Sequence, residues 1–136
     1  MKFQKITYQN LNARQKENYN FHKIAAALAD YGYSCMWLND DWQGADFIAH
    51  HVDGVDFLKV QLKSRLTISR KYEGKDIHIA FRNGDDIYVY PHDELKDTLF
   101  ALLPRTEARA SWRVGGSFSW PKLSEKLKVL LAGYKL

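Results

Sequence analysis

The sequence has a single cysteine and no long run of apolar residues. One cysteine excludes an internal disulfide framework and any zinc site built from several thiolates. Cys35 lies in a short run, 33–38, that is typical of a buried strand, so we expect it to be a small core residue. No apolar run approaches the roughly 20 residues that span a bilayer, and residues 1–5 lack the apolar stretch of a signal peptide. We therefore expect a cytoplasmic protein without a membrane segment.

The chain also lacks internal repeats, low-complexity tracts and linkers rich in proline, glycine or serine. Its 136 residues fit one domain of ordinary size. Hydrophobic residues make up 46% and aromatic residues 14% of the chain, which is enough for one core. We expect a single domain over residues 1–136, in which residues from about 104 to 136 form a C-terminal extension ending in a helix.

Hydrophobic periodicity and turn residues predict an α/β (α+β) fold, with a mixed central sheet and flanking helices. A first helix is expected over 11–31, capped by Asn10 or Asn12 and stopped by Gly32. Strands are expected near 34–38, 45–51, 55–63, 76–81 and 87–90, with a polar loop at 39–44. Asp93 is expected to cap a helix over 94–103, an irregular stretch to follow over 104–116, and Pro121 to begin a last helix.

The strands at 45–51 and 55–63 flank Asp53-Gly54, a strong signal for a two-residue turn whose central residues both take positive φ. Counting outward from this turn places Asp46 opposite Gln61. Because side chains alternate across a strand, Asp46, Gln61 and Lys63 share one face. The opposite face is apolar throughout and fixes the register; it holds Phe47, Ala49, Leu58, Val60 and Leu62.

This polar group has a clear chemical use. Mg²⁺ prefers hard oxygen ligands and keeps several waters. Asp46 offers a carboxylate, Gln61 an amide carbonyl and Leu62 a backbone carbonyl, while Lys63 can contact a metal-bound water and a phosphate. Such a set suits hydrolysis of phosphodiester bonds.

Gly44-Ala45-Asp46-Phe47 followed by Val60-Gln61-Leu62-Lys63-Ser64 is similar to the D…(D/E/Q)xK signature of the PD-(D/E)xK nuclease superfamily. The resemblance covers roughly residues 10–103 and is nearest to the Holliday-junction-resolvase-like and intron-endonuclease-like branches. It implies a restriction-endonuclease-like fold in which Asp46 and Gln61 bind Mg²⁺ or Mn²⁺ and Lys63 is catalytic. Ala45 stands where the signature has proline, and Gln61 removes one negative charge from the ligand set.

The first helix of this superfamily often carries a glutamate, and Glu17 is the candidate. Glu17 continues the apolar stripe of Phe21, Ile24 and Leu28 by one step of four. A charge in that place either emerges into solvent or has a partner, because an isolated buried charge is very costly. Both interpretations of Glu17, metal ligand and solvated helix end, stay open. Asp40 and Asp41 are expected on the surface of the polar loop.

Basic residues follow the proposed catalytic lysine, in a chain of net charge +4. Charge alone favours a solvated face, but the position of Arg65, Arg70 and Lys71 directly after Lys63 favours DNA phosphate contacts. Trp112 and Trp120 flank a glycine pair near the C-terminus and are candidates for base stacking.

These observations predict a metal-dependent DNA endonuclease. The first alternative is a DNA-binding protein of the same fold that has lost cleavage, which the glutamine at position 61 motivates. The second alternative, from another class, is a protein-interaction module that uses the aromatic and basic C-terminal segment. Many members of the superfamily cut both strands as dimers, so a homo-oligomer such as a dimer is compatible with the resemblance, which leaves the oligomeric state open.

Overall fold

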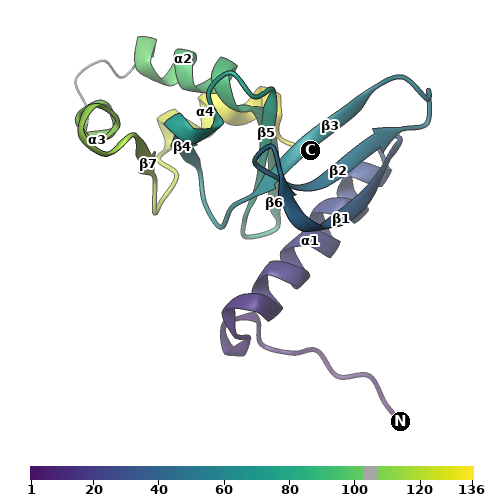
Figure 1. The fold of residues 1–136 in the computed structure, drawn as a ribbon. Coiled ribbons are helices and arrows are strands. Elements are labelled where there is room, and N and C mark those ends of the chain that lie inside the picture. The colour runs from purple at the N-terminus through teal and green to yellow at the C-terminus, as the bar shows by residue number, and fades with distance from the viewer. Residues whose placement is uncertain (103–106) are drawn as a thin grey trace.

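A five-stranded mixed sheet with helices packed on it forms the centre of the computed structural model, which describes residues 1–102 and 107–136 (Figure 1). The strand order is β1-β2-β3-β5-β6; β3 and β5 run parallel and the other neighbours run antiparallel. The prediction of a mixed α/β fold with flanking helices is confirmed. The strands of this sheet are β1 (Tyr33–Trp42), β2 (Ala45–His51), β3 (Phe57–Leu62), β5 (Ile77–Asn83) and β6 (Asp86–Pro91).

Helix α1 (Ala13–Ala29) precedes the sheet and begins at Asn12. The Asn12 side chain accepts from the Gln15 N–H, and the Gln15 side chain accepts from the Asn12 N–H, both at 2.9 Å. This capping box satisfies two N–H groups that the first turn leaves free. The chain then reverses at Gly32, whose φ of +87° explains why glycine follows the helix. The helix and its stop are therefore as predicted, to within two residues at each end.

The segment 39–44 is not the polar loop that the sequence suggested. Strand β1 continues to Trp42, and Trp42 pairs with Ala45 across a two-residue turn. Gln43 (φ +54°) and Gly44 (φ +88°) both take positive φ, which is what a tight hairpin turn requires. The Asp41 carboxylate accepts from the Gly44 N–H at 2.7 Å and fixes this turn. The prediction failed because Gln-Gly is a weaker turn signal than Asn-Gly or Asp-Gly.

The β2–β3 hairpin has the predicted register but not the predicted turn. Phe47 pairs with Val60 and Ala49 with Leu58, as counting from Asp53-Gly54 requires. Only Gly54 takes positive φ, however, and the His51 N–H donates to the Asp56 carbonyl across a longer loop. The Asp53 carboxylate accepts from two following N–H groups and stabilises this loop. The apolar face, not the turn type, determines the register.

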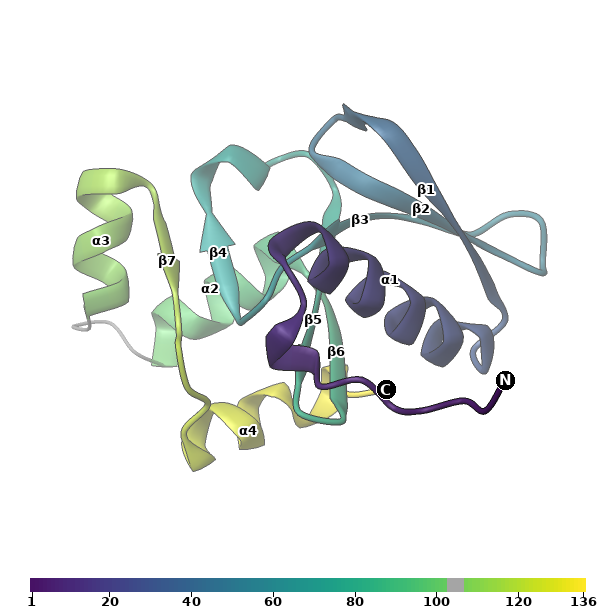
Figure 2. The ribbon, with the colours of Figure 1, turned by 90° about the horizontal axis from the view of Figure 1, so that it is seen from below.

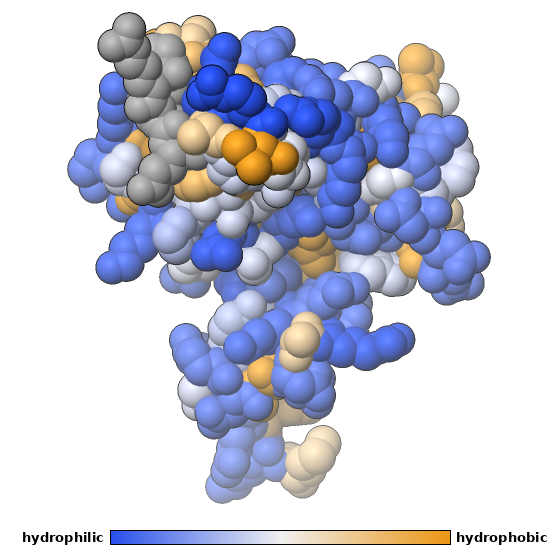
Figure 3. All heavy atoms as spheres, turned by 60° about the vertical axis from the view of Figure 1, so that its left-hand side comes forward, coloured by the Kyte–Doolittle hydropathy of each residue, from blue (hydrophilic) through white to orange (hydrophobic). Residues whose placement is uncertain are grey.

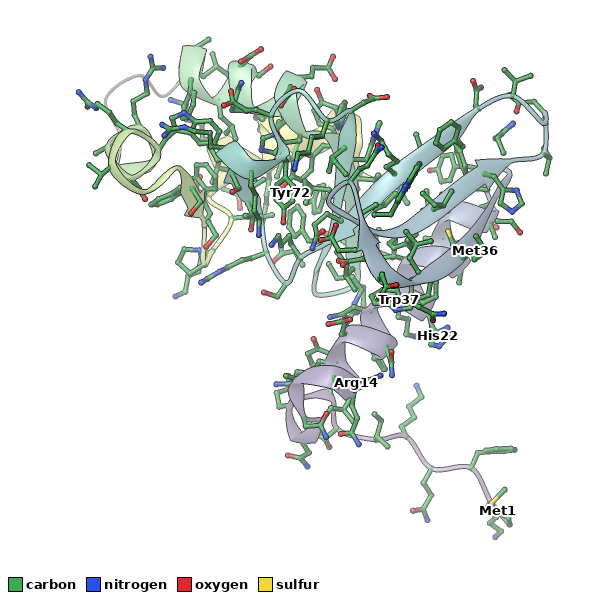
Figure 4. The ribbon with its side chains drawn as sticks, viewed as in Figure 1. Met1, Arg14, His22, Met36, Trp37 and Tyr72 are labelled. Atoms are coloured by element: carbon green, nitrogen blue, oxygen red, sulfur yellow. The ribbon has the colours of Figure 1, made fainter. Side chains whose placement is uncertain are left out.

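The sheet separates two hydrophobic clusters. Helix α1 lies across one face (Figure 2), where Ile24 and Leu28 pack against Phe47, Val60 and neighbouring apolar residues. The other face, over β5 and β6, packs against α2 (His92–Leu102), α4 (Glu125–Leu131) and a two-stranded sheet of β4 (Thr67–Ser69) and β7 (Ser117–Ser119). Neighbours on β1 take opposite sides (Figure 4): Trp37 packs on Phe21 of α1 at 5.1 Å between ring centroids, while Met36 is exposed.

The C-terminal part corrects three predictions. Helix α3 (Glu107–Gly115) occupies the stretch expected to be irregular, of which residues 103–106 lie outside the described part. Helix α2 begins one residue before Asp93, and the Asp93 carboxylate instead accepts from the Gly74 N–H at 2.9 Å. Helix α4 is capped by Ser124 rather than begun by Pro121, because the Ser124 side chain accepts from the Leu127 N–H.

No helix in the described ranges is long and apolar enough to cross a membrane. The face in Figure 3 is mostly hydrophilic, with apolar residues in small separate groups.

Candidate metal and nucleic-acid site

Strands β2 and β3 separate beyond the Phe47–Val60 pair. In a continued ladder the Leu62 N–H would meet a backbone carbonyl of β2. It donates instead to the Asp46 carboxylate, with 2.9 Å between Leu62 N and Asp46 Oδ2. The side chain thus replaces the ladder where the strands part, which keeps the buried N–H satisfied. We call the group formed by Asp46, Gln61 and Leu62 the β2–β3 fork.

The three predicted metal ligands belong to the fork. Asp46 and Gln61 each lie one residue beyond the last pair of the register, Phe47–Val60, on adjacent strands, and both are half-buried. The Gln61 amide reaches the Leu62 carbonyl, with 3.5 Å between Nε2 and the oxygen. This contact uses the amide nitrogen, whereas ligation of a metal ion would use Oε1. The ligand roles of Asp46, Gln61 and the Leu62 carbonyl stay predictions.

The surroundings of Asp46 favour a cation. Burial raises the pKa of this carboxyl, and the Leu62 N–H bond opposes the rise. The Glu17 and Asp41 carboxylates also raise the pKa of Asp46, while Lys63 lowers it. A partly desolvated carboxylate with two negative neighbours is stabilised by any positive ion placed beside it.

Lys63 lies next to the fork and is half-buried. Burial and the nearby Lys71 ammonium lower its pKa, and Asp46 opposes this change. Its Nζ lies 5.3 Å from the centroid of the Tyr72 ring, which Lys71 also approaches at 5.1 Å. Tyr72 is buried and stands near the middle of the molecule (Figure 4). Both ammonium groups therefore approach one ring, and the charges of Lys71 and Asp46 both act on Lys63.

Glu17 is exposed on α1, yet it faces the fork. It lines a cleft of about 460 Å³ together with Asp46, and it also lines a smaller pocket with Lys63. Glu17 thus stands between the proposed metal site and the proposed catalytic lysine. Its role as a metal ligand stays a prediction.

The cleft contains two carboxylates that the sequence analysis had assigned to the loop surface. Asp40 and Asp41 are exposed, but they belong to β1 and line the cleft with Glu17 and Asp46. Arg14, near the N-terminal end of α1 (Figure 4), is the cation among the lining residues. Recognition of the Gln43-Gly44 turn would have extended β1 and revealed this acidic wall.

The predicted phosphate-binding residues occupy different surroundings. Arg65 and Lys71 are exposed. Arg70 is also exposed, but its Nη2 donates to the Trp112 carbonyl at 2.7 Å and its guanidinium lies 5.5 Å from the Trp112 ring centroid. Arg70 therefore links the segment after β4 to α3, in addition to any contact with a phosphate. None of these DNA contacts is tested by the structure.

A second group of potential ligands lies at the turn of the β2–β3 hairpin. His51, Asp53 and Asp56 have ligand atoms within 4.8 Å of one another. Within the described ranges, this is the one group of three or more His, Cys, Asp or Glu residues with that spacing. No three of the carboxylates Glu17, Asp40, Asp41 and Asp46 approach one another to that spacing. An ion at the fork would thus need the amide and carbonyl oxygens, with waters completing its shell.

Comparison with known proteins gives no relative: no family model, no curated protein and no solved structure matches this chain.

Proposed function

We propose that the protein is a metal-dependent nuclease that cleaves DNA in the cytoplasm, with a restriction-endonuclease-like arrangement of its site. One observation carries this proposal: Asp46 takes the Leu62 N–H where β2 and β3 part, and Gln61, the Leu62 carbonyl and Lys63 stand beside it. This order of groups along two strands is the D…QxK pattern that resembles the PD-(D/E)xK nucleases.

The residues at the fork fit a small divalent cation. Asp46, Gln61 and the Leu62 carbonyl offer three hard oxygens, and Glu17 and Asp41 add negative charge nearby. When bound, Mg²⁺ or Mn²⁺ would supply Lewis-acid activation of water and neutralisation of phosphate charge. Gln61 brings no charge of its own, so the surrounding carboxylates compensate for the missing acid.

The remaining steps belong to the chain's own residues. Lys63 presents its ammonium to the phosphate, and stabilises the negative charge that develops on the phosphate oxygens during attack. Burial and the Lys71 ammonium lower the pKa of Lys63, and Asp46 opposes this change. Glu17 holds the negative side of the cleft and orients water toward Lys63.

The test is nicking of supercoiled plasmid in Mg²⁺ or Mn²⁺, beside a binding titration in Ca²⁺. Wild type should nick only with metal, and Gln61→Glu should need less Mn²⁺ for half-maximal activity because it restores a carboxylate to the set. Asp30→Asn, which removes an exposed carboxylate at the end of α1, serves as the matched control and should cut as wild type does. Cutting that survives chelation of all metal would contradict the proposal.

The amide geometry at position 61 favours one competing function, a DNA-binding protein without cleavage. Gln61 Nε2 lies 3.5 Å from the Leu62 carbonyl, and a contact with this carbonyl competes with its use as a metal ligand. Salt-dependent DNA binding by wild type with no nicking in Mg²⁺ or Mn²⁺ would establish this function in place of the nuclease. Absence of both binding and nicking would favour a protein-interaction role.

A further inference from the structure

Beyond Lys63, a series of adjoining pockets leads away from the acidic cleft. The Lys63 pocket, of about 260 Å³, shares Glu17 with the cleft. It shares Tyr8, Asn20 and Ser64 with a second pocket of about 400 Å³, which in turn shares Ser64 with a third that Arg65 and Trp120 line. Neighbouring pockets share wall residues and therefore lie next to one another; we call this series of pockets the Tyr8 groove.

Aromatic rings and an arginine stand on the wall of this groove. The Tyr8 and Tyr19 rings lie 5.2 Å apart between centroids and are tilted by 56°. The Arg82 guanidinium lies 5.4 Å from the Tyr8 centroid and 5.0 Å from the Tyr19 centroid. Three flat groups from the N-terminal segment, α1 and β5 therefore meet over the second pocket.

A buried asparagine fixes these groups in place. The Asn20 amide donates to the Tyr8 hydroxyl at 2.9 Å and accepts from Arg82 Nε at 2.8 Å. Asn20 is only 8% exposed, so this bridge is largely shielded from water. Asn20 thus holds the Tyr8 ring and the Arg82 guanidinium, and Tyr19 packs against both, an arrangement that lowers the entropy lost on binding.

Positive charges accompany the rings. Lys16 Nζ lies 5.5 Å from the Tyr8 centroid, and Lys23 Nζ lies 5.4 Å from the Tyr19 centroid. Within the part of the chain that the structure describes, neither lysine nor Arg82 forms an ion pair. Lys16 and Lys23 can contact phosphates, whereas the Arg82 guanidinium also donates to Asn20 and to the Gly84 carbonyl. At the other end, the carboxylates of the cleft repel a phosphate when no metal ion is bound there.

From this arrangement we infer that the Tyr8 groove binds an unpaired nucleic-acid strand and leads it to the fork. Aromatic faces interleaved with cations match successive bases and phosphates of a single strand. A duplex hides its base faces in the stack and offers a protein only phosphates and base edges. The inference rests on the proposed nuclease function, and it assigns that function a substrate with an unpaired segment.

The test is fluorescence anisotropy in Ca²⁺ with labelled oligo(dT), oligo(rU) and a DNA duplex of equal length. Tyr19→Ala should weaken single-strand binding about ten- to a hundredfold, because stacking of one base accounts for that range. Tyr19→Phe keeps the ring and should bind as wild type does. Duplex affinity should change little in either variant, and the two variants should melt within a few degrees of each other. The two oligonucleotides show whether the strand is DNA or RNA.

Two results would overturn the inference: Tyr19→Ala binding oligo(dT) and oligo(rU) as wild type does, or wild type preferring the duplex to both. Either result would leave the rings as a structural clamp for the N-terminal segment. The nuclease proposal fails separately. If wild type cuts no DNA but binds single strands through Tyr19, the inference about the Tyr8 groove is supported and the nuclease proposal is refuted. If cleavage requires Asp46 but is unchanged by substitution of Tyr19, the nuclease proposal is supported and the inference about the Tyr8 groove is refuted.

Discussion

Replacement of Asp46 by asparagine and by alanine should separate its two tasks. Asparagine is nearly the same size and keeps an oxygen that can accept from the Leu62 N–H, now 2.9 Å from the carboxylate. Alanine leaves that N–H without its acceptor in a partly buried fork. An unsatisfied donor costs about 1–3 kcal/mol, and since Asp46 is half-buried we take roughly 1–2 kcal/mol for Asp46→Ala. That loss corresponds to a fall in Tm of about 3–8 °C for a domain of this size.

The raised pKa of Asp46 also makes the stability of the folded protein depend on pH. Burial and neighbouring carboxylates raise the pKa of Asp46 in the folded state. The folded state then binds this proton more tightly than the unfolded state, so the stabilisation is complete below the unfolded pKa and is lost as pH rises through the folded pKa. An asparagine side chain carries no charge at any pH. Asp46→Asn should therefore be at least as stable as wild type at neutral pH, although it cuts no DNA.

Thermal melting by circular dichroism and plasmid nicking together check these outcomes. Mg²⁺ or Mn²⁺ should raise the Tm of wild type but not of Asp46→Asn, because a ligand stabilises only the state that binds it. Equal melting temperatures for the asparagine and alanine variants would refute the hydrogen-bonding role at the fork. Nicking by Asp46→Asn at the wild-type rate would refute the metal-ligand role.

Three further predictions concern the neighbours of the fork. Lys63→Ala should slow cleavage by about 10²–10³-fold and change DNA affinity far less, because its charge acts on the transition state; Lys126→Ala, an exposed lysine of α4, is the control in the nicking assay. Arg65→Ala should reduce the slope of log affinity against log salt by about 0.9 on duplex DNA, as a salt titration will show. Gly44→Ala should destabilise the protein by about 1–2 kcal/mol in a denaturant titration, since its φ is +88°, whereas Gly133→Ala, with no atom near its added Cβ, should not.

The register of the β2–β3 hairpin could be predicted because Phe47, Ala49, Leu58, Val60 and Leu62 form one apolar face. Only one register of β2 against β3 keeps these side chains on one face. The predicted register was therefore correct although the predicted turn type was wrong. The relation of Asp46 to Leu62 could not be predicted in the same way. It depends on where two strands stop pairing, and the local pattern of apolar residues does not encode that point.

The acidic wall was missed for a related reason. Asp40 and Asp41 belong to a run of polar residues, and such a run is typical of a loop. Only the positive φ of Gln43 and Gly44 turns the run into the end of a strand. Helix α3 was missed because its apolar residues are few and Gly115 and Gly116 follow them closely. Contacts such as Arg70 with Trp112 then fix a segment whose own pattern is weak.

The distribution of charge bears on how Gln61 can serve an active site. A glutamine in place of an acid weakens cation binding when it is considered alone. Here Glu17, Asp40 and Asp41 line the same cleft as Asp46, so the negative potential of the site does not depend on position 61. The same carboxylates disfavour approach of DNA without metal, whereas Lys63 and the lysines of the Tyr8 groove favour it at the other end. A divalent ion at the fork would offset much of this negative charge, which couples substrate binding at the reacting phosphate to the metal.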